Sequence, residues 1–313
     1  MCSTLKHNYT ELQTLIRLCL EINFCRSRYK NTDSRTVIMS APQTMIEVGI
    51  TSNDSVILRQ VHQQRFIPIT TSGFNMIDLS KQGDVFVLTM NDGENRWNTT
   101  FVREFSAALD EVEASTGPAA LVTTSATEKF FSNGLDLEWR SSTGEHRGGD
   151  RDAFGAEFMA LMGRIITFPM PTLAAVNGHA FGAGFMTALC HDIRAMRSDR
   201  GFMCANEVEI GMVIPNPELA LFRHKLPMNV FFETVQLARR WTGPEALKAG
   251  VAQLTEPLDA LLDVTIARAN ELARLGENRQ VYGRMKQSIY GENAAINGPH
   301  GPAYMLSHPE LYH

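Results

Sequence analysis

The sequence has few of the features that mark disulfide-bonded, metal-binding or membrane-spanning proteins. Its 313 residues include five cysteines, an odd number with no CxxC pair and no His-rich spacing. This pattern argues against a disulfide framework or a structural zinc site and predicts reduced thiols inside a cell, in the cytoplasm, a peroxisome or a mitochondrion. No run of about 18 apolar residues is present, so we expect no membrane span.

Basic charge is also scarce. Lys and Arg number 29 against 34 Asp and Glu, which gives a formal net charge of -5. Binding to nucleic acid needs a basic face that neutralises phosphates, so this balance argues against it. The hydrophobic content of 44% and charged content of 20% are ordinary for a globular protein with a sizeable core. An anionic ligand must therefore be met by local basic side chains.

The sequence changes character near Met76. Residues 1–75 mix scattered charge, Ser/Thr/Asn clusters and short apolar runs without a sustained period. Three interpretations stay open: a poorly ordered extension, a targeting segment and a small accessory domain. The extension is favoured because such mixed composition does not promise a core, while Glu11 and Glu21 are unsuited to an acid-poor transit peptide.

From Met76 onward, predicted strands alternate with predicted helices. The expected strands are 84–90, 119–124, 172–176 and 192–196, and the main expected helices are 99–114, 153–166, 182–190 and 258–275. This alternation predicts an α/β core over residues 76–255 and a helical region with a tail over 256–313. Three prolines follow Gly291, so we expect this tail to be loose or to form an interface arm.

Two glycine-bearing turns could each present a backbone N–H to a ligand. The first is Phe131-Ser-Asn-Gly-Leu-Asp136, and the second is Asn177-Gly-His-Ala-Phe-Gly-Ala-Gly184, which leads from a strand into a helix. Glycine allows close approach to the backbone, and amides at a helix N-terminus are unpaired. Such donors suit an oxygen that becomes negative during a reaction. Either turn alone is usually explained by tight packing, and no Lys-Ser/Thr follows as a phosphate loop requires.

Four motifs in order resemble the enoyl-CoA hydratase/isomerase family, also called the crotonase superfamily. They are Met90-Asn91 with Asn98, Phe131 to Asp136, Ala175 to Gly184, and Trp241-Thr-Gly-Pro-Glu-Ala-Leu-Lys-Ala-Gly-Val251. The resemblance implies an α/β fold, a crotonase-like spiral of β-β-α units with a helical C-terminal region. It also implies an acyl-CoA substrate, no metal, no cofactor beyond the coenzyme A of the substrate, and a homotrimer or hexamer.

By position in these motifs, the resemblance assigns the oxyanion hole to the N–H groups of Asn133 and Ala183. Hydratases of the family carry two glutamates, and here Met186 occupies the first position and Glu207 the second. Adding water calls for two positioned proton-transfer groups, whereas shifting a double bond can use one. The resemblance therefore points to the 3-enoyl-CoA to 2-enoyl-CoA isomerases. A hydratase and a non-catalytic acyl-CoA-binding protein stay open as alternatives.

Further candidates would bind or enclose the substrate. The basic residues expected near the coenzyme A phosphates are Arg96, Lys129 and Lys286. The other candidates for substrate binding are Asn98, Gly134, Asp136, Gly182 and Met186. An apolar wall beside Glu207 is expected from Phe181, Phe185, Met186 and Met212. Glu209 would share the face of Glu207 if this segment were a strand, which makes it the alternative base.

Overall fold

The computed structural model describes residues 36–41, 44–50, 56–61, 76–143 and 148–312. The chain divides into two units, Met1–Gln64 and Arg65–His313. The first contains a three-stranded antiparallel sheet of β1 (Thr36–Ala41), β2 (Thr44–Ile50) and β3 (Val56–Val61). A sheet of this kind is what the accessory-domain interpretation expects. The choice among the three interpretations of residues 1–75 stays a prediction, and residues 1–35 lie outside the described part.

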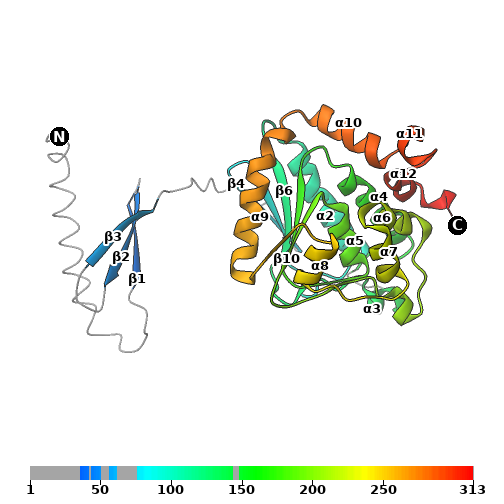
Figure 1. Cartoon of the computed structure of the whole chain (residues 1–313), viewed down its shortest axis with the longest axis horizontal. Coiled ribbons are helices and arrows are strands. Elements are labelled where there is room, and N and C mark those ends of the chain that lie inside the picture. The colour runs from blue at the N-terminus through cyan, green and yellow to red at the C-terminus, as the bar shows by residue number, and fades with distance from the viewer. Residues whose placement is uncertain (1–35, 42–43, 51–55, 62–75, 144–147, 313) are drawn as a thin grey trace. The chain divides into compact units, whose positions relative to one another are not determined.

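A six-stranded sheet runs through the second unit (Figure 1). Its strands, in spatial order, are β12 (Leu254–Glu256), β10 (Ile193–Arg197), β8 (Thr172–Val176), β6 (Ala120–Ser125), β5 (Val85–Met90) and β4 (Ile77–Gln82). All neighbours are parallel except the β4–β5 hairpin. Every residue of β6 and β8 is buried, which is the pattern of parallel strands covered on both faces.

The alternation of side chains along β5 fills both faces of this sheet. Val85 and Val87 join the apolar cluster beneath α9 (Leu258–Leu272), on one side of the sheet in Figure 1. Phe86 and Leu88 join the larger core, which includes α2 (Thr99–Glu113), α4 (Phe154–Ile166) and α5 (Ala183–Cys190). The site is built at one edge of this larger core.

A second sheet consists of three short parallel strands, β7 (Phe130–Ser132), β9 (His179–Phe181) and β11 (Met203–Cys204). Each follows a strand of the large sheet and leads toward a helix. The repeated units are β6-β7-α3, β8-β9-α5 and β10-β11-η1, where α3 is Leu137–Ser141 and η1 is the 3-10 helix Glu207–Ile210. This repetition is the β-β-α arrangement that the resemblance implies. The sequence did not reveal the short strands, because two or three residues carry no readable period.

The chain beyond β11 is mainly helical. Its helices are α6 (Asn216–Lys225), α7 (Met228–Val235), α8 (Gly243–Ala249), α9, η2 (Ala273–Gly276), α10 (Arg279–Tyr290), α11 (Ala294–Asn297), α12 (Pro302–Ser307) and η3 (Pro309–Leu311). The expectation of a loose tail is wrong, because Ala303 and Leu306 of α12 are buried in the main core, where α12 packs against α4 and α6. Among the described helices, none is both long and apolar enough to cross a membrane.

Candidate active site

The first glycine-bearing turn is fastened to the loop that precedes α2. The Asn133 N–H donates to the Glu94 carbonyl at 2.9 Å, and the Asp136 N–H donates to the Trp97 carbonyl at 3.0 Å. In the opposite direction, the Trp97 N–H donates to the Gly134 carbonyl at 2.8 Å. The backbone groups of this turn are therefore largely used within the fold.

These bonds correct the predicted oxyanion donor. The Asn133 N–H already has a carbonyl partner, so a substrate oxygen could bind it only by displacing that partner. The assignment of the oxyanion hole to Asn133 is therefore wrong. Within the described part of the chain, the Leu135 N–H has no acceptor, and Leu135 borders the pocket described below. The motif located the turn, but which amide is free depends on the partners supplied by the preceding loop.

The second turn places Ala183 at the first position of α5. The N–H at this helical position has no carbonyl one turn before it, and it lies at the positive end of the helix dipole. Gly182 caps the helix with φ 49° and ψ −119°, a conformation that favours glycine. A Cβ added to Gly134 would lie 2.7 Å from the Phe181 carbonyl oxygen and 3.6 Å from the Ala183 nitrogen. The two turns are thus in close contact.

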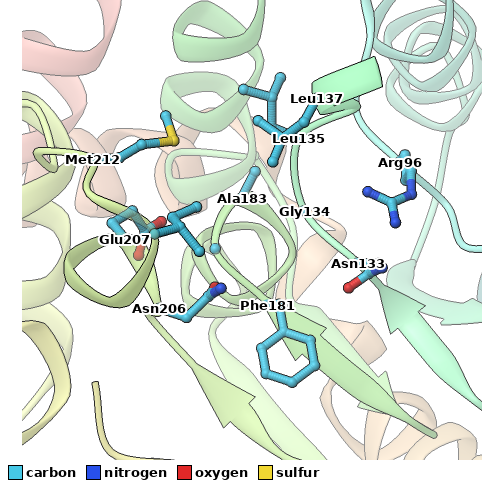
Figure 2. Close-up of a pocket in the computed structure, with 12 residues that line it drawn as sticks. Arg96, Asn133, Gly134, Leu135, Leu137, Phe181, Ala183, Asn206, Glu207 and Met212 are labelled. Carbon is cyan, nitrogen blue, oxygen red and sulfur yellow. The ribbon is translucent and has the colours of Figure 1, made fainter. Parts of the chain in front are cut away.

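A pocket lies between these turns and the segment after β11 (Figure 2). Its lining residues are Arg96, Asn133, Gly134, Leu135, Leu137, Phe181, Gly182, Ala183, Asn206, Glu207, Ile210 and Met212. Figure 2 shows Glu207 and Met212 on one side and Arg96 with Asn133 on the other. The pocket therefore brings together the two free amides, one carboxylate and one guanidinium.

Glu207 supplies the carboxylate of this pocket. It begins η1, which ends at Gly211 in the left-handed conformation with φ 73°. A Cβ added to Gly182 would lie 3.1 Å from Glu207 Oε1, whereas Oε2 is buried without a hydrogen-bond partner. Burial raises the pKa of Glu207, and a hydrogen bond from its own backbone N–H opposes part of that shift. Glu207 is therefore a pocket carboxylate with one oxygen close to Gly182 and one that lacks a hydrogen-bond partner among the described residues.

Glu209 does not serve as an alternative base. The segment is a 3-10 helix and not a strand, so the condition under which Glu209 would share the face of Glu207 is not met. Glu209 instead forms an exposed ion pair with Arg240 at 2.7 Å. It is not among the residues that line the pocket.

Two predicted substrate-binding residues are helix caps. The Asn98 side chain accepts from the Phe101 N–H at 2.9 Å and caps α2, and Asp136 accepts from the Trp139 N–H at 3.0 Å and caps α3. The Asn98 amide also donates to Asp136 Oδ2 at 3.3 Å. Because neither lines the pocket, their assignment to substrate binding is corrected to a structural role as helix caps.

Three further predicted residues lie away from the pocket lining. Lys286 is 4% exposed and pairs with Asp192 at 2.8 Å, so its ammonium group is tied inside the fold rather than free at an entrance. The Lys129 ammonium lies over the Phe130 ring, 4.9 Å from its centroid. Met186 is buried in the core on α5. Of the three basic candidates, Arg96 borders the pocket.

The apolar wall beside Glu207 is partly the expected one. Phe181 and Met212 line the pocket, whereas Phe185 is fully buried in the core. The sequence did not single out Leu137 or Ile210, which also line the pocket. Their place in the wall depends on how α3 and η1 turn, and no local periodicity indicates this.

The sequence also did not indicate a second buried carboxyl, that of Glu218 on α6. This side chain is 7% exposed. Burial raises its pKa to about 8, and the nearby Glu207 adds to the increase. A glutamate in the first turn of a helix usually reads as an exposed residue that complements the helix dipole. Glu218 does not line the pocket, so it does not replace the glutamate missing at Met186.

We expect Glu218→Gln to flatten the pH dependence of stability. Because the folded pKa of about 8 exceeds the ordinary value of 4.5, the stability contribution is full below pH 4.5 and is lost as pH rises to about 8. At roughly 1.4 kcal/mol per pKa unit, the loss amounts to a few kcal/mol. Denaturant unfolding at several pH values measures it, with the exposed Glu277→Gln as the control. Parallel pH curves for wild type and Glu218→Gln would contradict the expectation.

The described residues contain neither a cluster of metal-binding side chains nor an exposed thiol. Within them, no group of three or more His, Cys, Asp and Glu side chains is arranged to hold a metal ion. Cys190 and Cys204 are buried free thiols, and burial raises the pKa of each to about 12. Such thiols are poor nucleophiles, because the reactive form is the thiolate.

Comparison with known proteins identifies the family. The family model described as enoyl-CoA hydratase/isomerase matches residues 80–293. The chain belongs to the enoyl-CoA hydratase/isomerase family. It is 31% identical to enoyl-CoA delta isomerase 2, peroxisomal, of Arabidopsis thaliana over 229 residues, which cover 71% of this chain and 95% of the relative. It is 32% identical to enoyl-CoA delta isomerase 1, peroxisomal, of the same plant, over 69% of this chain and 90% of the relative.

Solved structures of the family share the fold. A probable enoyl-CoA hydratase of Mycobacterium tuberculosis matches with a TM-score of 0.59 and 25% identity, over 68% of this chain and 87% of that one. An enoyl-CoA hydratase/isomerase family protein of Pseudomonas syringae matches with a TM-score of 0.62 and 24% identity, over 68% and 90%. The predicted crotonase-like fold class is confirmed. The protein is an enzyme of the enoyl-CoA isomerase or hydratase type.

Proposed function

We propose that the protein is a Δ3-Δ2-enoyl-CoA isomerase that moves the double bond by proton transfer through Glu207. The observation that carries this proposal is the single carboxylate in a pocket bordered by two free amides. Met186, at the position of the first hydratase glutamate, is buried in the core. One proton-transfer group is sufficient for a double-bond shift, whereas water addition calls for two. The names of the Arabidopsis relatives agree with isomerisation.

The proposed reaction begins with the thioester carbonyl between the N–H groups of Leu135 and Ala183. Glu207 removes a proton from C2 of a 3-enoyl-CoA, and the released electron pair forms a C1=C2 bond as the thioester oxygen becomes negative. Each amide donor stabilises this oxygen by roughly 3 kcal/mol. Protonated Glu207 then returns the proton to C4. The double bond comes to lie between C2 and C3, the carbonyl reforms, and no water is consumed.

The surroundings of Glu207 favour this role. Phe181, Ile210 and Met212 give the pocket an apolar side. A carboxylate whose pKa is raised by burial is a stronger base than an exposed one, and its conjugate acid still donates a proton to carbon. Arg96, on the opposite side, supplies positive charge for the polar part of coenzyme A.

The pH profile of kcat/KM should report the ionisation of Glu207. Because the base must be ionised and burial raises its pKa, activity should fall on the acid side at a higher pH than an ordinary carboxyl of pKa 4.5 would give. Rates with a short 3-enoyl-CoA between pH 4.5 and 8 measure this limb. An acid limb centred at or below pH 4.5 would contradict the assignment of Glu207 as the base.

The reaction type is tested with two substrate classes. A panel of 3-enoyl-CoA thioesters of several chain lengths measures isomerisation, and 2-enoyl-CoA in water measures hydration. Isomerisation that exceeds hydration supports the proposal, whereas dominant hydration favours a hydratase. Tight acyl-CoA binding without turnover on either class favours a binding protein. We also propose an intracellular enzyme that assembles as a trimer or hexamer.

A further inference from the structure

Glu94 holds Asn133 by both its main chain and its side chain. The Glu94 carbonyl accepts from the Asn133 N–H at 2.9 Å, and Glu94 Oε2 accepts from Asn133 Nδ2 at 2.8 Å. The same Oε2 also accepts from Arg96 Nε at 2.8 Å and lies 2.6 Å from Arg96 Nη2. One carboxylate oxygen therefore joins two residues that line the active-site pocket.

Asn133 lies immediately before the residues that carry the oxyanion donor. Gly134 follows it with φ +78°, and the free N–H belongs to Leu135. Glycine is the most flexible residue of the backbone, so the direction of the next N–H must be set by its neighbours. On one side the turn packs against the Phe181 carbonyl, and on the other the contacts to Glu94 hold it. Glu94 is thus placed to fix the direction of the Leu135 N–H.

The ion pair between the Glu94 carboxylate and Arg96 contributes little to the stability of the fold. Its side chain is 41% exposed and that of Arg96 is 39% exposed, and exposed ion pairs contribute on the order of 0–1 kcal/mol. The largest effect on Glu94 comes from the Asn133 amide, which lowers the pKa of the carboxyl, followed among favourable contacts by Arg96. The ionised carboxylate is therefore held chiefly by the residue that begins the oxyanion turn.

We propose that Glu94 is a positioning residue of the reaction. Its carboxylate holds the Asn133 side chain so that the Leu135 N–H faces the thioester oxygen, and it orients Arg96 at the opposite border of the pocket. This inference rests on the proposed function and names a residue that touches neither the substrate nor the reacting atoms. A displacement of about 1 Å at a reacting centre can lower a rate about 100-fold, so a positioning contact here has a measurable effect.

Three single variants separate the two contacts of Glu94. Asn133→Ala removes the amide, Arg96→Met removes the guanidinium and keeps an unbranched side chain, and Glu94→Gln removes the charge while the backbone bond to Asn133 stays. Glu138→Gln on α3 is the matched control, because Glu138 is an exposed glutamate of the neighbouring segment that does not line the pocket.

We expect Glu94→Gln and Asn133→Ala each to lower kcat about 10-fold or more, because they displace a donor used in the transition state. Asn133→Ala should change KM little, whereas Glu94→Gln should also raise KM, because it loosens Arg96. In the Asn133→Ala background, Glu94→Gln should cost little further kcat, since the two residues act through one contact. Arg96→Met should chiefly raise KM, and Glu138→Gln should match wild type. Fully additive effects of Glu94→Gln and Asn133→Ala, or an effect of Glu94→Gln on KM alone, would overturn the proposal.

A readout without turnover separates this inference from the proposed function. Acetoacetyl-CoA is a 3-ketoacyl thioester whose enolate absorbs in the near ultraviolet, and the oxyanion donors should favour that enolate in the bound state. At saturating ligand, Glu94→Gln and Asn133→Ala should weaken the band, whereas Arg96→Met should preserve it. If the wild-type protein shows the enolate band but no isomerase turnover, the proposed function is wrong. The positioning role would then still be supported by a weaker band in Glu94→Gln and Asn133→Ala. An undiminished band in Glu94→Gln would overturn the positioning role.

Discussion

Replacing Glu207 with glutamine should lower kcat for double-bond migration by about 10²–10⁴-fold, the usual contribution of a positioned proton-transfer group. Glutamine keeps the shape of the side chain but cannot accept the C2 proton. Because burial raises the pKa of Glu207, its ionised form opposes folding above its ordinary pKa, so the neutral glutamine should not destabilise the protein. Turnover of a 3-enoyl-CoA and the binding of coenzyme A are the two measurements.

The matched control for this variant is Glu209→Gln. Glu209 lies in the same 3-10 helix, but its exposed carboxylate pairs with Arg240 outside the pocket. Glu209→Gln should keep near wild-type turnover, and both variants should bind coenzyme A. Near-normal turnover in Glu207→Gln would rule out Glu207 as the base. Loss of turnover in Glu209→Gln alone would indicate that Glu209, which lies outside the pocket, is the base.

The sequence predicted the long elements of the core because their burial leaves a period in the chain. The strand expected at 172–176 coincides with β8, and the helix expected at 153–166 differs from α4 by one residue at its start. The short strands β7, β9 and β11 left no such signal, although they deliver the two turns and the segment of Glu207 to one place. The elements closest to the site were therefore the hardest to predict.

For the site residues, the sequence located the turns but did not show which of their groups are free to bind a substrate. The turn around Asn133 was found from its glycine, but the free amide is that of Leu135, because Glu94 supplies a carbonyl to Asn133. Lys286 was expected at an entrance, and its burial depends on contacts of α10 with Asp192 and the Met170 carbonyl, which are distant in the sequence. A motif identifies a local conformation. Which of its groups stay free is decided by contacts from distant parts of the chain.

The buried carboxyls at and near the pocket are expected to lower the stability of the fold, although one of them is needed for activity. Glu207 and Glu218 are both buried carboxyls, and burial raises the pKa of each. Among the described residues, Glu207 Oε2 has no hydrogen-bond partner. Buried carboxylates without partners disfavour folding at neutral pH. Glu207 gains a role as a base from this setting. Neutral substitution at either position should therefore stabilise the fold, whereas activity should fall sharply at Glu207.

Ala183→Pro should lower kcat/KM for isomerisation by about 10²–10³-fold, the loss measured when one oxyanion donor is removed. Proline lacks the N–H, and its ring places a carbon where the donor pointed. The first position of a helix tolerates proline, because its N–H has no helical partner and its φ is already near that of proline. Gly182 precedes it and carries no Cβ for the ring to meet. Isomerase kinetics and a thermal melt measure the two effects.

The control for Ala183→Pro is Ala294→Pro, which also replaces an alanine at the first position of a helix but lies outside the pocket. Ala294 is the first residue of α11, in the C-terminal region outside the pocket, and its Asn293 cap has an extended backbone that accepts a following proline. Ala294→Pro should retain activity and a similar melting temperature. Free coenzyme A has no thioester carbonyl, so it should still bind Ala183→Pro, whereas acyl-CoA should bind that variant more weakly. If Ala183→Pro folds and turns over 3-enoyl-CoA normally, its N–H does not hold the thioester oxygen, and the reaction must draw its oxyanion donors from elsewhere.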